Sequence, residues 1–501
     1  MKKILLLALL ALSIPAFAAK PKAIVVFLAD DLGYGDTAAY GQSLVPTPNL
    51  NRLCNEGCRF TDCHSATPVC TPSRYSMMTG RYPHRLPNNN ILDGDAKLII
   101  PVEGSGEENV TLPVLMKRAG YKTAAIGKWH LGLGDGKGPI DWNGEIKPSP
   151  KEVGFDRSFV MAATADRVPC VYIEDGRVAN LDPADPIEIS YDRKANPKWE
   201  GEITARTNPE MLKDWGRPSD YQHDKTIIDG ISRIGHMRGG KAALWKDQDL
   251  ADTITDKAID FIKDAKGEPI FLYFATNDIH VPRDPHARFR GVSALGIRGD
   301  ATVQMDDCLG RVRAALAENG YDDTLFIFTS DNGPRVSDGY EDGARDAWKG
   351  VNPAAPWAGG KYSVLEGGTR IPMVACWPGH IQPNTVSHAL LSHTDYARSL
   401  AAIAGVEVPQ GACRDSQELS YVILGQNENG RVSLPEESAW GPWGYRKGNW
   451  KFIEGANYGK GVEGPYLFDL TTDPTERENL AERYPEKVKE IQAEIRALRR
   501  K

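Results

Sequence analysis

The stretch AIVVFLADD, residues 23–31, decides how the rest of the sequence is interpreted. Its apolar residues follow one another without the alternation of a half-exposed strand, which predicts a strand buried on both faces. The run stops at two acidic residues, Asp30 and Asp31. In open α/β sheets, ligands bind beyond the carboxyl ends of the strands. The stretch therefore predicts a functional site at one edge of a parallel sheet.

Three further apolar runs end in polar, chemically capable residues. Any one such ending is common turn chemistry, but four together predict an active site. Helical patterns at 112–119, 251–264 and 301–318 separate the runs, which predicts an α/β fold. We expect a large, mostly parallel central sheet with helices on both faces. Residues 123–126 lead to Lys128 and His130, residues 270–275 lead to His280, and residues 325–329 lead to Asp331 and Asn332.

The remaining segments have weaker or different patterns. Residues 157–250 are interpreted as an insertion with short elements, and residues 334–360 as a long loop that serves as a lid or binding wall. A hairpin at 443–453, a strand at 466–470 and a helix at 485–498 predict a small α+β C-terminal subdomain. The predicted division is a catalytic domain at 19–410 and this subdomain at 411–501.

The N-terminus predicts export. Met1-Lys2-Lys3 precedes an apolar run at 4–14 and a small-residue cleavage site at Ala16-Phe17-Ala18, so residues 1–18 are interpreted as a signal peptide. The mature protein is expected in the periplasm or outside the cell, without a membrane span. The formal net charge is −7 and basic residues are dispersed, which argues against nucleic acid or a membrane surface as a partner.

Three of the eight cysteines, Cys54, Cys58 and Cys63, lie close together in sequence. Their spacing does not fit the usual structural zinc patterns. We interpret them as packing residues or as one local disulfide, since export permits disulfides.

The most specific motif is PVCTPSR, residues 68–74, which continues to Arg81. A second motif runs from Gly120 to Thr123 and on to GKWH at 127–130. Together they resemble the two signatures of type I sulfatases, members of the alkaline-phosphatase-like superfamily. The resemblance extends from about residue 22 to 380, and more loosely to the end of the chain.

This resemblance implies a role for each matching residue. Cys70 would be oxidised to formylglycine (3-oxoalanine) by a maturase, and Arg74 would hold the modified side chain. A hydrated aldehyde suits sulfate ester cleavage because one hydroxyl attacks sulfur and the other expels the sulfate. By the same resemblance, His130 is the base for that second step and His280 the acid for the leaving alcohol, while Lys128 and Lys361 neutralise sulfate and leaving-group charge.

Asp30, Asp31, Asp331 and Asn332 form the predicted metal site. Three carboxylates and an amide oxygen are hard donors, which suit calcium or magnesium better than zinc. The resemblance favours one calcium ion.

The substrate is expected to be a sulfated carbohydrate or an aryl sulfate. Residues 164–170 resemble bacterial sulfatases that act on 6-O-sulfated galactose or N-acetylgalactosamine. Asp166, Arg167, His223 and the loop 334–360 are candidate sugar contacts. Two alternatives remain: a phosphate or phosphonate monoester hydrolase of the same superfamily, and a non-catalytic protein that binds sulfated glycans.

Overall fold

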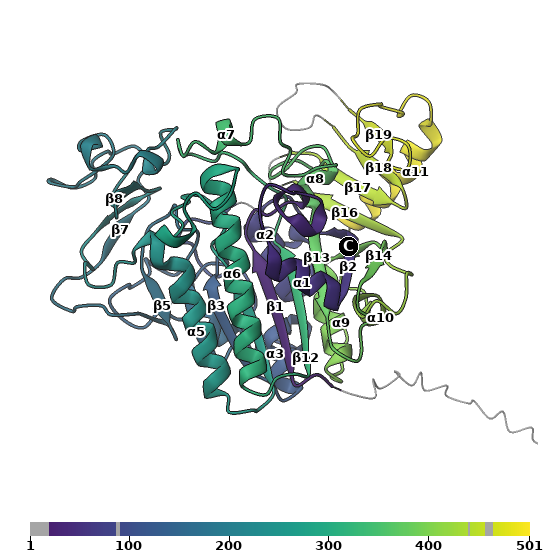
Figure 1. Cartoon of the computed structure of the whole chain (residues 1–501), viewed down its shortest axis with the longest axis horizontal. Helices are drawn as coiled ribbons and strands as arrows, with labels where there is room; N and C mark the ends of the chain where they lie inside the picture. The colour runs from purple at the N-terminus through teal and green to yellow at the C-terminus, as the bar shows by residue number, and fades with distance from the viewer. Residues whose placement is uncertain (1–19, 87–90, 439–440, 456–463, 501) are drawn as a thin grey trace, which may run out of the picture.

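A computed structural model of the chain describes residues 20–86, 91–438, 441–455 and 464–500 (Figure 1). The predicted signal peptide lies outside these residues. Within them, no helix has the length and apolar character needed to cross a membrane.

Parallel strands form the centre of the main sheet, as predicted. Strand β1 (Ala23–Ala29) pairs with β12 (Thr324–Ser330) on one side and with β11 (Ile270–Ala275) on the other. Strands β3 (Lys122–Lys128) and β4 (Arg157–Met161) continue the parallel order beyond β11. Every residue of β1, β11 and β12 is buried, which is why these segments show no alternation in the sequence.

The flanks of the same 11-stranded sheet are mixed. Next to β12, β13 (Arg370–Cys376) and then β2 (Cys58–His64) add antiparallel neighbours. On the other side, β5 (Tyr172–Glu174) and β6 (Arg177–Val178) follow β4, also antiparallel. The short strands β14 (Thr385–Ser387) and β15 (Leu391–Ser392) pair with β2.

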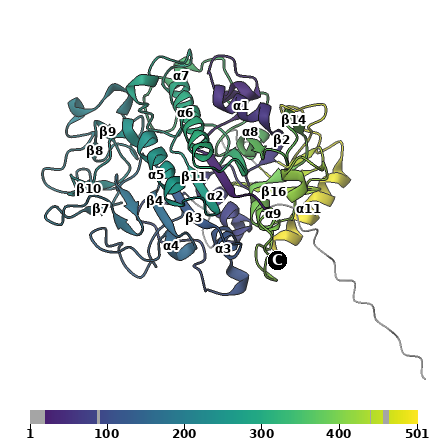
Figure 2. The same ribbon diagram turned by 60° about the horizontal axis from the view of Figure 1, so that its bottom comes forward.

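Helices cover both faces of the sheet (Figures 1 and 2). The predicted helices are present, although α6 begins at Gly296 rather than at 301, because Gly296 and Gly299 hide its pattern. One face carries α1 (Pro48–Glu56), α5 (Leu250–Asp264) and α6 (Gly296–Glu318); the other carries α2 (Cys70–Thr79), α3 (Leu112–Arg118) and α9 (Tyr396–Ile403). The short helices are α4 (Pro150–Val153), α7 (Ala344–Ala347), α8 (Glu366–Thr369) and α10 (Ser420–Ile423).

The interpretation of residues 157–250 as an insertion was partly wrong. Its first part forms β4, β5 and β6, which extend the main sheet. These strands are short and carry exposed charges at Arg157 and Arg177, so they lack the continuous apolar run of the central strands. The rest has the short elements expected of an insertion: β7 (Glu188–Ser190), β8 (Ile227–Ile228), β9 (Ile231–Ser232) and β10 (His236–Arg238).

The C-terminal region forms a four-stranded antiparallel sheet covered by a helix. The predicted hairpin, strand and helix are all present, whereas the first strand of the sheet was missed. The helix packs Val488, Ile491 and Ile495 against Trp443 and Phe452 of the sheet. The boundary at 410/411 stays a prediction. The elements are β16 (Ser433–Glu437), β17 (Trp443–Lys447), β18 (Trp450–Ile453), β19 (Tyr466–Asp469) and α11 (Pro485–Arg499).

All eight cysteines carry free thiols, so Cys54, Cys58 and Cys63 act as packing residues rather than as a disulfide. Cys58 and Cys63 are buried on β2.

A buried cluster of charges joins the C-terminal sheet to the main sheet. His64, at the end of β2, lies 2.9 Å from both Asp62 and Glu436. Glu366 contacts Arg446 at 2.6 Å and Lys451 at 3.1 Å. Burial on its own lowers the pKa of His64, but the surrounding carboxylates raise it above its usual value. We call Asp62, His64, Glu366, Glu436, Arg446 and Lys451 the interface ion cluster.

The substitution Lys451→Met tests this cluster. It leaves Glu366 and Glu436 buried without their ammonium partner, so we expect the free energy of unfolding to fall by about 3–5 kcal/mol. Lys489→Met is the control, because its pair with Glu486 is exposed and contributes less than about 1 kcal/mol. Thermal unfolding of both variants measures the difference in stability between them. Equal melting temperatures for Lys451→Met and Lys489→Met would contradict the role given to the cluster.

Candidate active site

Four parallel strands deliver the predicted metal ligands, Lys128 and both histidines to one edge of the sheet. The register pairs Ala29 with Ser330, and Ala275 with both Leu28 and Gly127. The strands therefore end level with one another. Gly127 allows the closest approach, because a Cβ there would lie 1.9 Å from the carbonyl oxygen of Ala275.

Three carboxylates meet at this edge. One ligand atom from each of Asp30, Asp31 and Asp331 lies within 4.8 Å of the others, and all three residues are buried. Asn332 donates to Asp31 at 2.8 Å. Asp30 Oδ1 and Asn332 Oδ1 have no hydrogen-bond partner within the described residues. Buried orphan oxygens beside clustered carboxylates fit a hard divalent cation.

Two cations hold the carboxylates on one side. Lys128 Nζ lies 2.5 Å from Asp30 and 3.8 Å from Asp331. Arg74 donates to Asp331 through Nε at 2.9 Å, to the carbonyl of Lys128 at 2.9 Å and to the hydroxyl of Tyr273 at 3.2 Å. Burial on its own raises the pKa of Asp331, but Arg74 and Lys128 lower it below its ordinary value.

Lys361 compensates the charge on the other side. Its Nζ lies 2.9 Å from Asp31 and 3.0 Å from Nε2 of His280. Burial on its own lowers the pKa of Lys361, yet Asp31 and other nearby groups keep it well above the ordinary value. The ammonium therefore stays charged in a fully buried position.

Cys70 is the first residue of α2 and lines a cavity. Its Sγ is 3.3 Å from Nδ1 of His130. The other nitrogen of His130, Nε2, donates to the carbonyl of Leu92 at 2.9 Å, which leaves Nδ1 as the acceptor facing Cys70. Burial, aided by the charge of Lys128, lowers the pKa of His130 well below its usual value.

A backbone carbonyl also fixes the tautomer of His280, but here Nδ1 is the donor and Nε2 the acceptor. His280 Nδ1 donates to the carbonyl of Val281 at 2.6 Å, so Nε2 accepts from Lys361. Burial and Lys361 lower the pKa of His280 to about 4. Both imidazoles are therefore neutral at neutral pH, and each turns a lone pair towards the site.

Three residues of the site have left-handed backbone conformations. The φ angles are 56° at Asp31, 55° at His130 and 74° at Tyr362. Such conformations cost about 1–3 kcal/mol each outside glycine and concentrate at functional sites.

A cavity of about 480 Å³ opens above Cys70. The three candidate sugar contacts lie in its wall. Arg167 pairs with Asp166 at 2.8 Å, and its Nε makes no hydrogen bond to any described residue. His223 lies between Asp166 at 3.4 Å and Asp220 at 2.8 Å. Burial on its own lowers the pKa of His223, but these carboxylates raise it to about 9, so the ring is a cation at neutral pH.

The sequence predicted that the loop 334–360 serves as a lid or binding wall, but it did not indicate which of its residues line the cavity. The loop contributes Arg335 and Asp338 to the cavity, and Tyr362 follows it. Tyr273, the partner of Arg74, was also missed. The available signal in the sequence was the hydroxyl group of Tyr273 within the otherwise apolar run 270–275.

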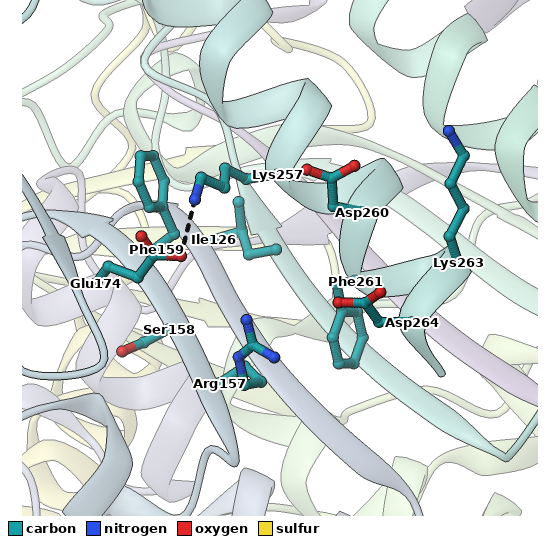
Figure 3. A pocket seen from close by; sticks show the side chains of 10 residues that line it. All are labelled: Ile126, Arg157, Ser158, Phe159, Glu174, Lys257, Asp260, Phe261, Lys263 and Asp264. Carbon is teal, nitrogen blue, oxygen red and sulfur yellow. Dashed lines mark hydrogen bonds and ion pairs between the residues drawn. The ribbon is translucent and has the colours of Figure 1, made fainter. Parts of the chain in front are cut away.

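A second cavity, of about 300 Å³, lies between β4 and α5 (Figure 3). Its lining is mixed in charge, and Lys257 is already paired with Glu174 at 2.7 Å. None of the predicted site residues lines it. Predicted site residues such as Cys70, His130 and His280 instead line the cavity of about 480 Å³.

The chain is similar to known proteins over most of its length. The sequence matches the family described as "Sulfatase" over residues 22–406, and "N-sulphoglucosamine sulphohydrolase, C-terminal" over residues 360–501. It is 44% identical to the N-acetylgalactosamine-6-O-sulfatase of Bacteroides thetaiotaomicron, over 94% of this chain and 92% of that protein. It is 31% identical to arylsulfatase A of Homo sapiens, over 94% of this chain and 86% of that protein.

Solved structures show the same similarity. A structure described under the metabolism of multiple glycosaminoglycans by Bacteroides thetaiotaomicron has a TM-score of 0.90 at 42% identity, covering 96% of this chain and 100% of that chain. A sulfatase from Pseudoalteromonas sp. has a TM-score of 0.66 at 27% identity, covering 95% and 90%.

Calcium titration followed by thermal unfolding tests the three-carboxylate group. Calcium at 100 times its dissociation constant should stabilise the protein by about 2.7 kcal/mol. Asp30→Asn should abolish this gain, because it removes one of the three carboxylates that would hold the ion. Asp264→Asn, at an exposed position, should keep the full gain. A calcium-dependent shift that persists in Asp30→Asn would place the ion elsewhere.

Proposed function

Since the chain belongs to the sulfatase family and is a sulfuric ester hydrolase, we propose that it removes 6-O-sulfate from N-acetylgalactosamine or galactose, with Cys70 as the precursor of its nucleophile. The observation that supports this most directly is the position of Cys70. It begins a buried helix and lines the cavity, within 3.3 Å of a neutral imidazole and in the field of Lys128 and Lys361.

The side chain at position 70 acts after maturation to formylglycine. Its hydrated aldehyde supplies one hydroxyl that attacks sulfur and a second that permits release of sulfate. Nδ1 of His130 is the base that takes a proton from this side chain, since the ring is neutral and Nε2 is held by Leu92. Arg74 anchors the far side of the site through Asp331.

Lys361 and His280 serve the leaving alcohol. In the free protein the proton between them resides on Lys361, because burial holds the pKa of His280 at about 4. A bound sulfate ester brings negative charge to the pair and raises the affinity of His280 for a proton. The pair is thus placed to protonate the leaving oxygen as the ester bond breaks.

Asp30, Asp31, Asp331 and Asn332 would hold one calcium ion. When bound there, the ion would supply positive charge to polarise sulfate oxygens and to lower the cost of bringing an anion to this edge of the sheet. The orphan oxygens of Asp30 and Asn332 support this assignment.

The cavity wall supports a sugar substrate. A volume of about 480 Å³ accommodates a sugar ring in addition to the sulfate, and the wall offers charged hydrogen-bond donors from Arg167 and His223. The N-acetylgalactosamine-6-O-sulfatase that is 44% identical to this chain supports the same substrate class. Asp166 would orient both donors. The N-terminal sequence pattern supports export of the protein from the cytoplasm, and such glycans are found outside it.

Mass spectrometry of the tryptic peptide 60–74 tests the maturation of Cys70. We expect the mass of an aldehyde at Cys70, while Cys63 in the same peptide remains alkylatable and serves as the internal control. Cys70→Ala should fold normally and lose at least about 10³-fold in turnover. Native protein that is active with an unmodified thiol would overturn the mechanism.

Sulfate release from isomeric sugars tests the substrate class. The enzyme should act on N-acetylgalactosamine 6-sulfate and discriminate strongly against the 4-sulfate. His223→Gln should raise KM for the 6-sulfate by about 10-fold, the typical loss for a charged hydrogen bond, with little effect on a small aryl sulfate. Preference for 2-O-, 3-O- or 4-O-sulfated sugars would refute the proposed position.

A further inference from the structure

Lys361 has a third partner that the proposed chemistry leaves without a role. Besides Asp31 and His280, its Nζ contacts Oδ2 of Asp338 at 3.2 Å. Burial on its own raises the pKa of Asp338, but Lys361 lowers it below the ordinary value, so the carboxylate is charged. A second carboxylate on this lysine is not needed for the three-carboxylate group.

The two carboxylates pull the ammonium in different directions. Asp31 is 1% exposed and lies at the end of β1, whereas the side chain of Asp338 is 21% exposed and lines the cavity. Asp31 therefore lies on the side of the ammonium that faces the buried edge of the sheet. Asp338 lies on the cavity side of the ammonium, which also contacts His280.

Asp338 is itself held in place. The hydroxyl of Tyr362 donates to the same oxygen, Oδ2, at 2.9 Å. The backbone N–H of Tyr362 donates to the carbonyl of Pro68 at 2.9 Å, two residues before Cys70, and that of Lys361 donates to Pro334 at 3.0 Å. These contacts connect the Lys361 segment to both the α2 and β12 sides of the site.

Tyr362 adopts this arrangement at a conformational cost. Its φ of 74° is unfavourable for a bulky side chain, and it allows the ring to lie along the cavity wall with its hydroxyl on Asp338. A strained backbone at this position is explained if the direction of the side chain matters.

We propose that Asp338, held by Tyr362, is a positioning residue that keeps Lys361 beside His280 on the leaving-group side of the cavity. The proposal rests on the role given above to Lys361 and His280. It predicts a defect that grows as the leaving group becomes a poorer one, because such alcohols depend most on charge neutralisation and protonation.

The competing role for Asp338 is a direct contact with sugar hydroxyls. The two roles differ in what a small aryl sulfate reports. Loss of a sugar contact raises KM for the sugar and leaves aryl sulfates unaffected. Misplacement of Lys361 slows both classes of substrate.

The experiment compares matured wild type, Asp338→Asn and Tyr362→Phe on aryl sulfates whose phenols span a range of pKa, and on N-acetylgalactosamine 6-sulfate. Asp338→Asn should lower kcat/KM by up to about 100-fold. Its plot of log kcat/KM against phenol pKa should be steeper than that of wild type. Tyr362→Phe should show the same trend with a loss of about fivefold, equivalent to one neutral hydrogen bond. Glu486→Gln, which removes a carboxylate from an exposed lysine pair, is the matched control and should keep the wild-type slope.

Each other outcome overturns the inference. An unchanged slope with a uniform loss of rate and a lower melting temperature indicates a purely structural role. A defect confined to the sugar indicates a sugar contact. If matured wild type releases sulfate from neither substrate class, the proposed function itself is wrong. If wild type is active and the variants keep its slope, only the inference about Asp338 is wrong.

Discussion

The burial of three carboxylates at one edge of the sheet is the constraint on which the site depends. Asp30, Asp31 and Asp331 cannot all be ionised in a buried position without opposing charge, because desolvation and mutual repulsion both act against them. The chain brings Arg74, Lys128 and Lys361 to the same place from three different elements. At this edge the fold therefore brings three cations to offset the charge of three carboxylates, and these cations are among the groups to which we assign catalytic roles.

The sequence predicted this part of the molecule well, for a physical reason. Central parallel strands must be continuously apolar, so the point where β1 and β12 change to polar residues is visible in the sequence. The predicted Cys70, His130 and His280 lie together because parallel strands end at a common edge and α2 begins there. Motif resemblance supplied the roles, which the strand pattern alone does not contain.

The wall of the cavity was predicted less completely, because it comes from segments without periodicity. Asp338 is one acidic residue among several in the loop 334–360, and its importance follows only from its contacts with Lys361 and Tyr362. The β4–β6 strands were missed for a related reason: they are short, and tertiary pairing rather than local pattern stabilises them. The interface ion cluster likewise joins residues far apart in sequence, such as His64 and Glu436.

The division between strand ends and wall has a consequence for how such enzymes diversify. The groups to which we assign ester hydrolysis lie at the sheet edge, on α2 and at Lys361, whereas the proposed sugar contacts lie on the long segments 157–250 and 334–360. Apart from the contact of Asp338 with Lys361, the side-chain contacts described above for the buried charge network come from outside those segments. Descendants of one ancestor could thus exchange glycan preference through loop turnover while the hydrolytic machinery was inherited unchanged.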